Sequence, residues 1–255
     1  MALSKKDRRQ EQILAALDRN PAMRVSELAG TLDVSSETIR RDLSRLDDAG
    51  RISRTYGGAV RGQVSEPHLA ERLGQHIGAR QAIARVAMDL IGDAETIFIG
   101  GGATTLHFAR ALRSTARRLT VLTPAHRVAT ELSENANIQI MCLPGFYDGK
   151  EGLVTGPETL TAIRRFYTPV AFMGASAIDA GGVSEAMLGP SEVYRAMIEC
   201  SQTAYILADQ SKFYRRSLRY ITGWTEGIHL VTDAAPDADL MERLSAGNAT
   251  LHVSG

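Results

Sequence analysis

The feature that most restricts the fold is a regular alternation of short apolar segments with amphipathic segments between residues 81 and 233. Continuously apolar segments indicate strands buried on both faces of a sheet, because a half-exposed strand alternates apolar with polar side chains. We expect such strands at 96–99, 119–123, 138–143, 170–174, 203–208 and 229–231. We expect helices at 83–90, 106–112 and 125–132, and a last helix and strand within 234–255. This order predicts an α/β domain in which helices cover a mostly parallel sheet.

The N-terminal part of the chain follows a different pattern. Helical spacing of its apolar residues predicts helices at 7–17, 26–32 and 37–46. Pro21 ends the first helix, since proline disfavours the α region for the residue before it. Ser26 is the expected N-cap of the second helix, and either Ser35 or Ser36 that of the third. A short helix, a tight turn and a longer capped helix form a helix-turn-helix.

The outward face of the third helix combines hydroxyls with arginines. Hydroxyls at a helix N-terminus can bind phosphates, and arginines suit guanine edges or phosphate oxygens in a major groove. Charged helix faces usually do no more than contact water, but the order and length of these elements favour DNA binding. The residues of this helix expected to contact DNA are Ser35, Ser36, Glu37, Thr38, Arg40, Arg41, Ser44 and Arg45.

Residues 51–61 form an alternating, basic segment with a glycine turn, which predicts a β-wing beside the third helix. Arg51, Arg54 and Tyr56 of this wing are expected to contact the DNA backbone or minor groove. Lys and Arg balance Asp and Glu over the whole chain at 29 each, which alone argues against nucleic acid. Residues 1–62, however, carry 12 Lys and Arg against 9 Asp and Glu, so a basic face is permitted there.

Composition also bounds the location and the cofactors. The two cysteines, Cys142 and Cys200, stand far apart, which argues against a disulfide scaffold or a zinc finger. The histidines show no ligand spacing, so no metal and no other cofactor is expected. The N-terminal residues lack the apolar core of a signal peptide, and no segment is apolar enough to span a bilayer. We therefore expect a cytoplasmic protein that does not contact a membrane.

Polar and glycine residues follow four of the expected strands. Ligands of open α/β sheets bind beyond the carboxyl ends of the strands, so these residues are candidates for a binding site. Gly100–Thr105 has the chemistry of a phosphate cradle before a helix, although taken alone a glycine turn needed only for packing is equally plausible. The candidates at the four strand ends are Gly100, Gly101, Gly102, Ala103, Thr104, Thr105, Thr123, Ala125, Gly174, Ser176, Asp179, Asp209 and Lys212.

The N-terminal segment resembles the DeoR family of bacterial regulators. The resemblance rests on residues 34–43, Val-Ser-Ser-Glu-Thr-Ile-Arg-Arg-Asp-Leu, followed by Leu46, Gly50, Arg54 and residues 56–59, Tyr-Gly-Gly-Ala. The rest of the chain resembles the sensor domain of that family, which is similar in fold to ribose-5-phosphate isomerase. Gly145 and Glu192 join the candidate site through this resemblance, which implies a phosphorylated sugar or a related metabolite as effector.

Four positions depart from the usual pattern of the family. Gly100 and Pro169 stand where an Asp is usual, Pro124 stands where an Asn is usual, and Pro144 replaces the first of two glycines. Several polar groups that could hold sugar hydroxyls are thereby absent. The identity of the effector is left open by these departures, whereas the fold and DNA binding are not affected.

Three functions are compatible with these patterns. The first is an effector-responsive regulator, usually a repressor, that binds operator DNA as a homodimer or homotetramer. The second is a sugar-phosphate isomerase-like enzyme with an appended DNA-binding module, which the absent carboxylate at Gly100 disfavours. The third is a helix-turn-helix used only for protein contact. The expected domains are a winged helix-turn-helix at 1–62, a connector at 63–80 and an α/β effector-sensing domain at 81–255.

Overall fold

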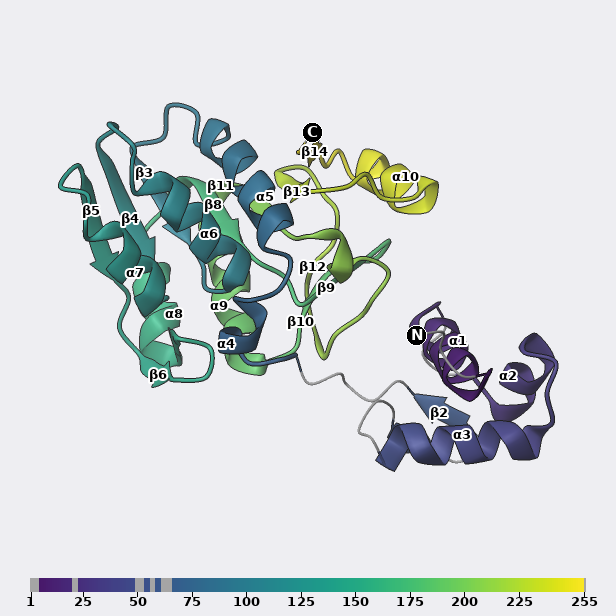
Figure 1. Ribbon diagram of the computed structural model, residues 1–255. Coiled ribbons are helices and arrows are strands. Elements are labelled where there is room, and N and C mark those ends of the chain that lie inside the picture. Colours follow the sequence, from purple (N-terminus) through teal and green to yellow (C-terminus); the bar gives the residue numbers. More distant parts are fainter. Residues whose placement is uncertain (1–4, 20–22, 49–52, 56–57, 61–65, 255) are drawn as a thin grey trace. The chain divides into compact units, whose positions relative to one another are not determined.

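The computed structural model describes residues 5–19, 23–48, 53–55, 58–60 and 66–254. The chain divides into two compact units, Met1–Glu66 and Pro67–Gly255 (Figure 1). Residues 67–80, expected as part of a connector, therefore belong to the second unit. They contain a short helix and the start of a longer one. Leu69, Arg72 and Arg80 of this segment are buried in the second unit.

The first unit is a helix-turn-helix followed by a two-stranded antiparallel hairpin. Its elements are α1 (Lys5–Arg19), α2 (Val25–Thr31), α3 (Ser36–Asp48), β1 (Ser53–Thr55) and β2 (Gly58–Val60). One apolar cluster joins the three helices, with Ile13 and Leu17 of α1, Leu28 of α2, and Ile39 and Leu43 of α3 all fully buried. The helical spacing of these residues was sufficient to predict the elements, because each helix buries one stripe.

The caps differ in one place from the sequence expectation. Ser26 was expected to cap α2, but Arg24 is the N-cap, and its backbone N–H donates to the Glu27 carboxylate at 2.7 Å. The helix thus begins one residue earlier, with Val25 buried in the core. Ser35 caps α3, since its Oγ accepts the backbone N–H of Thr38 at 3.2 Å.

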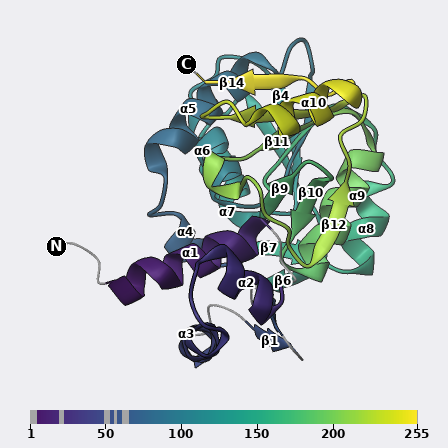
Figure 2. The same ribbon diagram turned by 90° about the vertical axis from the view of Figure 1, so that its right-hand side faces the viewer.

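The second unit is built on a seven-stranded sheet in which all paired strands are parallel, in the order β14-β13-β11-β8-β3-β4-β5. The strands are β3 (Thr96–Ile99), β4 (Leu119–Thr123), β5 (Ile138–Cys142), β8 (Thr168–Met173), β11 (Ser201–Leu207), β13 (Ile228–Thr232) and β14 (Leu251–Val253). The strand β14 forms one edge (Figure 2). The expected α/β fold with a mostly parallel sheet is confirmed.

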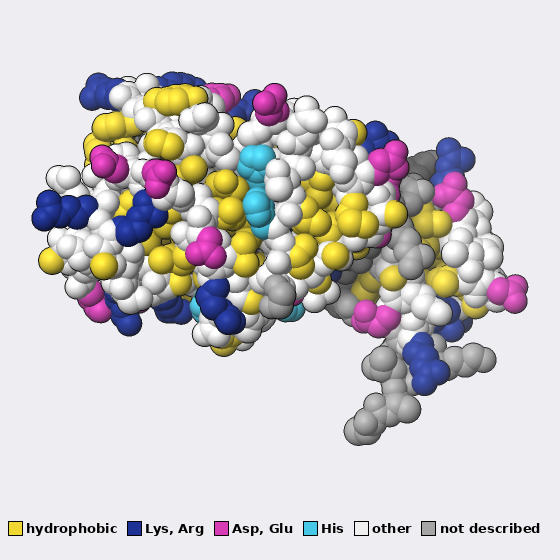
Figure 3. Space-filling view, turned by 90° about the horizontal axis from the view of Figure 1, so that it is seen from above, with side chains coloured by type: hydrophobic (Ala, Val, Ile, Leu, Met, Phe, Trp, Pro, Cys, Tyr) yellow, Lys and Arg dark blue, Asp and Glu magenta, His cyan; other side chains and the backbone are white. Residues whose placement is uncertain are grey.

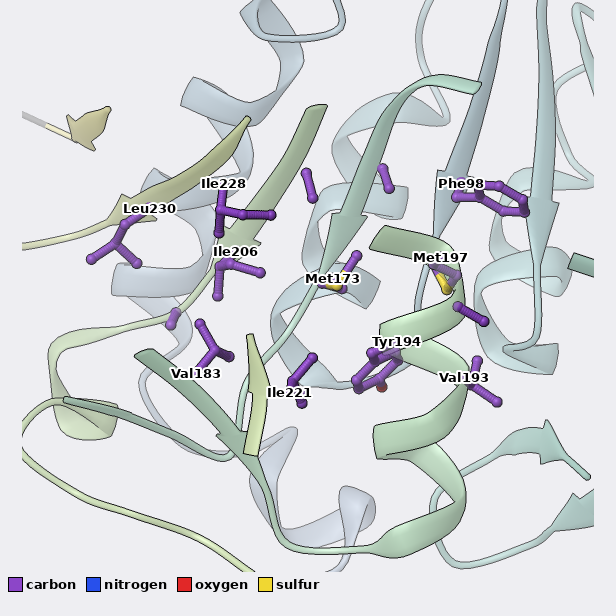
Figure 4. Close-up of a cluster of buried hydrophobic side chains, with 14 of the residues drawn as sticks. Phe98, Met173, Val183, Val193, Tyr194, Met197, Ile206, Ile221, Ile228 and Leu230 are labelled. Carbon is purple, nitrogen blue, oxygen red and sulfur yellow. The ribbon is translucent and has the colours of Figure 1, made fainter. Parts of the chain in front are cut away.

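Helices cover both faces of this sheet. One face packs against α5 (Ile77–Asp89), α6 (Ala103–Leu112) and α7 (His126–Leu132). The other face packs against α8 (Pro157–Ile163), α9 (Leu188–Glu199) and α10 (Ala238–Ala246). Figure 4 shows part of the second layer, where Met197 of α9 belongs to the same buried cluster as Met173 and Phe98 of the sheet. Burial on both faces explains why the strands are apolar along their whole length.

Several smaller elements were not expected from the sequence. They are the helix α4 (Leu69–Arg72), the hairpin β6 (Phe146–Asp148) and β7 (Leu153–Thr155), and a three-stranded antiparallel sheet of β9 (Ala177–Asp179), β10 (Gly182–Glu185) and β12 (Arg219–Thr222). Each is too short for a period of apolar residues to be visible. In the part of the chain that the structure describes, no helix is long and apolar enough to cross a membrane.

Candidate functional site

The third helix presents its charged side chains on the side opposite the core. Ile39 and Leu43 are fully buried, whereas the side chains of Arg40, Arg41 and Arg45 are 59%, 73% and 55% exposed. Ser36, Thr38 and Ser44 of the expected set are half-buried. The helix therefore has a long, accessible basic face with hydroxyls along its border.

Glu37 lies within reach of two of these arginines. Its carboxylate is 3.3 Å from Arg41 Nε and 3.9 Å from Arg40 Nη1. At the start of the helix the hydroxyls of Ser35 and Thr38 are 2.9 Å apart. The acid thus orients two guanidinium groups on the outer face, and Ser35 and Thr38 form the cap that begins the helix.

An acid that sequence reasoning did not include among the site residues anchors this helix. Asp42 lies on the inner side of α3 with its side chain 1% exposed, and Arg9 of α1 donates to it at 2.5 Å. This hydrogen bond raises the pKa of Arg9. The pair links α1 to α3 and so sets the orientation of the exposed face.

The hairpin after α3 is only partly described. Arg54 lies in β1 opposite Ala59 of β2, as the wing interpretation expects. Arg51 and Tyr56, the other two expected contacts of the wing, lie outside the described residues.

The second unit has a hollow at the carboxyl ends of β3, β8 and β11. These strands are adjacent, and the chain direction across the sheet changes between β3 and β8. Such a switch leaves room beyond the strand ends, because the connections leave in opposite directions. Six residues that the strand-end argument named line this hollow, namely Gly101, Gly102, Ala103, Thr104, Gly174 and Lys212.

The loop between β3 and α6 forms the floor of the hollow. Gly102 has a φ of +121° and precedes α6 without any side chain to cap it. A Cβ added at Gly101 would lie 2.7 Å from Leu153 Cδ2, so the backbone approaches the β7 strand closely. The first backbone N–H groups of a helix have no partner within it, and they carry a partial positive charge. The loop therefore combines a close approach of the backbone to Leu153 with a helix start that no side chain caps.

Sequence reasoning missed most of the charged residues around this floor. Arg72, Arg80, Glu151, Glu185 and the phenol of Tyr194 also line the hollow. The phenol donates to the carbonyl of Gly101 at 2.9 Å and fixes the loop from above. Both arginines fall in the segment that was interpreted as a connector, where mixed charges gave no sign of burial. The signal that could have found Arg80 is its helical spacing from Ile83 and Ala87, which places it on the buried stripe of α5.

A deeply buried ion pair stands at one side of the hollow. Arg80 Nε is 3.3 Å from the Asp209 carboxylate, with side chains 2% and 1% exposed. Burial raises the pKa of Asp209, but a hydrogen bond from Ser211 and the positive charges of Arg80, His76 and Lys212 outweigh it, so the pKa lies below its ordinary value. Asp209 was expected to contact the effector directly; it instead lies behind Arg80, which lines the hollow in its place.

A second ion pair joins Arg72 to Glu151, with side chains 10% and 5% exposed. Arg72 Nε also donates to the carbonyl of Pro67 at 2.9 Å, and the Arg72 carbonyl accepts from Arg80 Nη1. The carboxylate of Glu185, another lining residue, accepts from Ser176 at 2.5 Å. Ser176, another expected contact, therefore supports a lining residue rather than lining the hollow itself.

The remaining expected residues lie outside the hollow. Gly100 lies under the loop, where a Cβ would be 3.0 Å from Tyr194 Cε1, and Thr105 Oγ1 donates to the Gly102 carbonyl at 3.1 Å. Thr123 Oγ1 accepts the N–H of Ala125 at 3.1 Å in the turn after β4.

Gly145, Asp179 and Glu192 have structural partners elsewhere. A Cβ at Gly145 would lie 2.1 Å from Thr159 Oγ1, so this glycine permits a close approach of the chain. Asp179 pairs with Arg216, and Glu192 lies 2.9 Å from Arg219 on the surface. Neither the position of these residues at strand ends nor the family pattern predicted these contacts, because the partners lie far apart in the sequence.

Two family models match this chain. The DeoR-like helix-turn-helix domain matches residues 9–63, and the DeoR C terminal sensor domain matches residues 75–234. The chain belongs to the DeoR family. Its two matched regions fall on the helix-turn-helix unit and on the unit that contains the hollow. The resemblance expected from the sequence is confirmed.

Relatives within the DeoR family are regulators. The chain is 30% identical to the HTH-type transcriptional repressor CsqR of Escherichia coli (strain K12), over 92% of this chain and 91% of that protein. It is 31% identical to the L-fucose operon activator of Haemophilus influenzae, over 82% of this chain and 85% of that protein. This DeoR-family chain is accordingly a transcriptional regulator with a DNA-binding and a sensor domain, and not an enzyme.

Solved structures show a partial likeness. Ribose 5 phosphate isomerase A from Neisseria gonorrhoeae is similar with a TM-score of 0.41 and 17% identity. The similarity covers 54% of this chain and 53% of the isomerase, so the chain spans about half the length of that protein.

Proposed function

We propose that this DeoR-family chain represses a carbohydrate or polyol catabolic operon and that a phosphorylated sugar or related metabolite modulates its binding to operator DNA. The observation that carries the effector part is the hollow beyond β3, β8 and β11, where the uncapped start of α6 meets Arg72, Arg80 and Lys212. A phosphate suits such a helix start, and a lysine is a common partner of its oxygens. Glu151 and Glu185 supply acceptors for hydroxyls of the same molecule.

The exposed face of α3 supports the DNA-binding part. Arg40, Arg41 and Arg45 are more than half exposed on a helix whose other side is fixed in the core. In helix-turn-helix proteins the second helix of the motif, which is α3 here, enters the major groove. We assign Ser35, Ser36, Thr38 and Ser44 either to contacts with DNA phosphates or to capping the start of α3. We assign Arg54 of the hairpin to a contact with the DNA backbone.

The assembly and the location follow from operator binding. Operators usually contain repeated half-sites, which paired helix-turn-helix units match, so the active form is a homodimer or homotetramer. A regulator of this kind acts where the chromosome is, in the bacterial cytoplasm. We propose repression rather than activation as the sign of the response; the named relatives include both a repressor and an activator.

The test is a titration of the purified protein against the intergenic DNA upstream of its own gene, at controlled salt. It is repeated with a panel of phosphorylated sugars and polyols. We expect sequence-selective, salt-sensitive binding that one of these compounds weakens. Absence of selective binding to any intergenic DNA of its own operon would contradict the proposal.

Two matched sets of variants separate the parts of this function. Arg40→Ala and Arg41→Ala should each weaken operator binding by about 1–3 kcal/mol, the usual cost of losing a base-reading arginine. Lys212→Gln should leave DNA binding intact but remove the response to the compound, since Lys212 lines the hollow. Arg165→Gln, an exposed cation of the second unit, is the control for all three.

A further inference from the structure

The segment by which the chain enters the second unit is also a wall of the hollow. The second unit begins at Pro67, and α4 ends at Arg72, which lines the hollow. Any signal that travels along the chain from the hollow to the helix-turn-helix unit passes through this segment. Its contacts therefore lie on the covalent path between the hollow and the DNA-binding unit.

The guanidinium of Arg72 makes contacts in two directions. Its Nε donates to the Pro67 carbonyl at 2.9 Å, and its Nη2 pairs with the Glu151 carboxylate. The planar fork of an arginine makes both contacts possible at once, because it presents five N–H donors in fixed directions. Through this one side chain, the first residue of the second unit is tied to the loop between β6 and β7.

The helix α4 depends on these contacts for its position. It has four residues, and so short a helix is not stable by itself. Leu69 is 3% exposed and lies against the Glu151 loop, where a Cβ at Gly152 would be 3.5 Å from its Cδ2. The Arg72 carbonyl also accepts from Arg80, which Asp209 holds on the other side. The backbone of α4 is thus fixed from the Arg80 side, and Pro67 is held through the Arg72 side chain.

An anion in the hollow changes the balance at this side chain. Glu151 and Arg72 both line the hollow, so a bound phosphate competes with the carboxylate for the same guanidinium and repels the carboxylate. A buried carboxylate that loses its partner is costly, so the loop and the arginine must rearrange together. Two arrangements with different affinities for an anion are the requirement for a ligand-driven switch.

We propose that Arg72 is a positioning residue that couples the hollow to the DNA-binding unit, by exchanging Glu151 for an anionic effector and thereby releasing Pro67. This inference rests on the proposed effector site in the same hollow. In the unliganded protein the pair of Arg72 and Glu151 holds the entry segment in place. In the liganded protein the segment 67–72 is looser, and operator affinity falls.

The first arm of the test needs no ligand. Glu151→Gln keeps the shape of the side chain but weakens its hold on Arg72, so the full-length variant should resemble the liganded protein. We expect faster amide hydrogen exchange in residues 68–73 and operator binding weaker by at least about fivefold, the lower end of ordinary coupling between sites. The control is Glu226→Gln at an exposed position of the same unit. If the Glu151→Gln variant has the amide exchange rates and the operator affinity of the wild type, the inference is wrong.

The second arm uses inorganic phosphate as the probe, with chloride at equal ionic strength as its reference. In the wild type, phosphate should raise exchange in residues 68–73, which a merely structural ion pair would not do. Arg72→Lys retains the charge but lacks the fork, so at saturating phosphate its exchange should not respond. If phosphate stabilises the wild type without changing amide exchange at residues 68–73, the coupling is refuted but the proposed anion site is supported. If phosphate changes neither the stability nor the amide exchange of the wild type and of Lys212→Gln, the proposed site is wrong. The first arm then still decides the role of Arg72.

Discussion

At the scale of single residues, the charges of this protein fall into two classes that differ in burial. Arg80 and Asp209 are almost fully buried and hold each other, whereas Glu37 and the arginines around it are exposed. A buried pair is costly to break, because one charge is left in a medium of low polarity. An exposed pair contributes little to stability and acts mainly through the field it creates.

Replacing Asp209 with Ala should therefore destabilise the second unit. Arg80 would keep its charge without this partner, which typically costs about 3–5 kcal/mol. The measurement is urea unfolding followed by the fluorescence of Trp224, the single tryptophan of the chain, which is buried in that unit. Glu242→Gln, at an exposed position of α10, is the control. A variant that unfolds at the wild-type urea concentration would show that the pair does not stabilise the fold.

The lowered pKa of Asp209 adds a dependence on pH with a definite sign. Its folded-state pKa lies below the unfolded value, so its contribution is present above the unfolded pKa and is lost as pH falls through the folded one. The stability difference between wild type and Asp209→Ala should consequently shrink in acid. Unfolding curves at several acidic pH values check this, and a difference that stays constant would contradict it.

Glu37→Gln is expected to strengthen DNA binding without regard to sequence. The carboxylate neutralises part of the field of Arg40 and Arg41, and its removal leaves both guanidinium groups available to phosphates. Affinity for random duplex should rise and its salt dependence should steepen. Titration at two salt concentrations measures both, with Glu226→Gln as the control. Weaker binding to random duplex would mean that Glu37 is needed to hold the arginines in place.

At the scale of elements, the start of a helix matters twice in this protein. The helix α3 begins with a side-chain cap from Ser35, whereas α6 begins at Gly102, which has no side chain. A cap satisfies the N–H groups of the first turn, so they are not available to a ligand. A start without a cap leaves the same groups to bind an anion. The two helix starts therefore suit a fixed DNA-reading element and a ligand site, respectively.

Ser35→Ala should loosen the first turn of α3. Loss of an N-cap hydroxyl costs about 0.5–2 kcal/mol, and here the hydroxyl also lies beside Thr38 Oγ1. We expect faster amide exchange at residues 38–40 and weaker operator binding. Ser36→Ala is the matched control for the exchange measurement, because Ser36 is the first residue of the helix and not its cap. Equal effects from the two variants would argue against Ser35 as the cap.

At the scale of the whole molecule, several histidines of the second unit are harder to protonate in the folded protein than in the unfolded chain. Burial lowers the pKa of His107, His229 and His252, with the neighbouring His252 lowering that of His229 further. His229 Nδ1 accepts the N–H of Thr250 at 2.8 Å, which a protonated ring nitrogen cannot do. Figure 3 shows histidine side chains among hydrophobic ones on one surface of the molecule.

These histidines should make the second unit less stable in weak acid. The unfolded chain takes up protons near the ordinary histidine pKa of about 6.5, while the folded protein takes them up at lower pH. Stability is thus full above that pH and declines as pH falls below it. Trp224 fluorescence during urea unfolding at pH 7.5 and 5.5 measures the decline. His229→Gln should reduce it and His126→Gln, at an exposed position, should not. A stability that does not change between the two pH values would contradict this account.

The predicted part of the fold is the part that depends on neighbours along the chain. The stripe of Ile39, Leu43 and Leu46 specified a helix, and the apolar run 96–99 specified a central strand, because each pattern reports burial within one element. The glycines and threonines at 101–104 likewise predicted an anion-binding loop. The sheet of β9, β10 and β12 was not predicted, since its short strands combine segments from either side of α9.

The sequence by itself determined the helices of the DNA-binding unit, the strands of the parallel sheet and their order along the chain, and the membership of the family. Only the tertiary structure decided which charges meet. Arg72 and Glu151 are 79 residues apart, and Arg80 and Asp209 are 129 apart. The partner of a buried charge depends on the path of the whole chain, because the ends of parallel strands converge only after the sheet has formed. Local periodicity contains no information on that convergence, and for this reason the walls of the hollow had to be read from the folded protein.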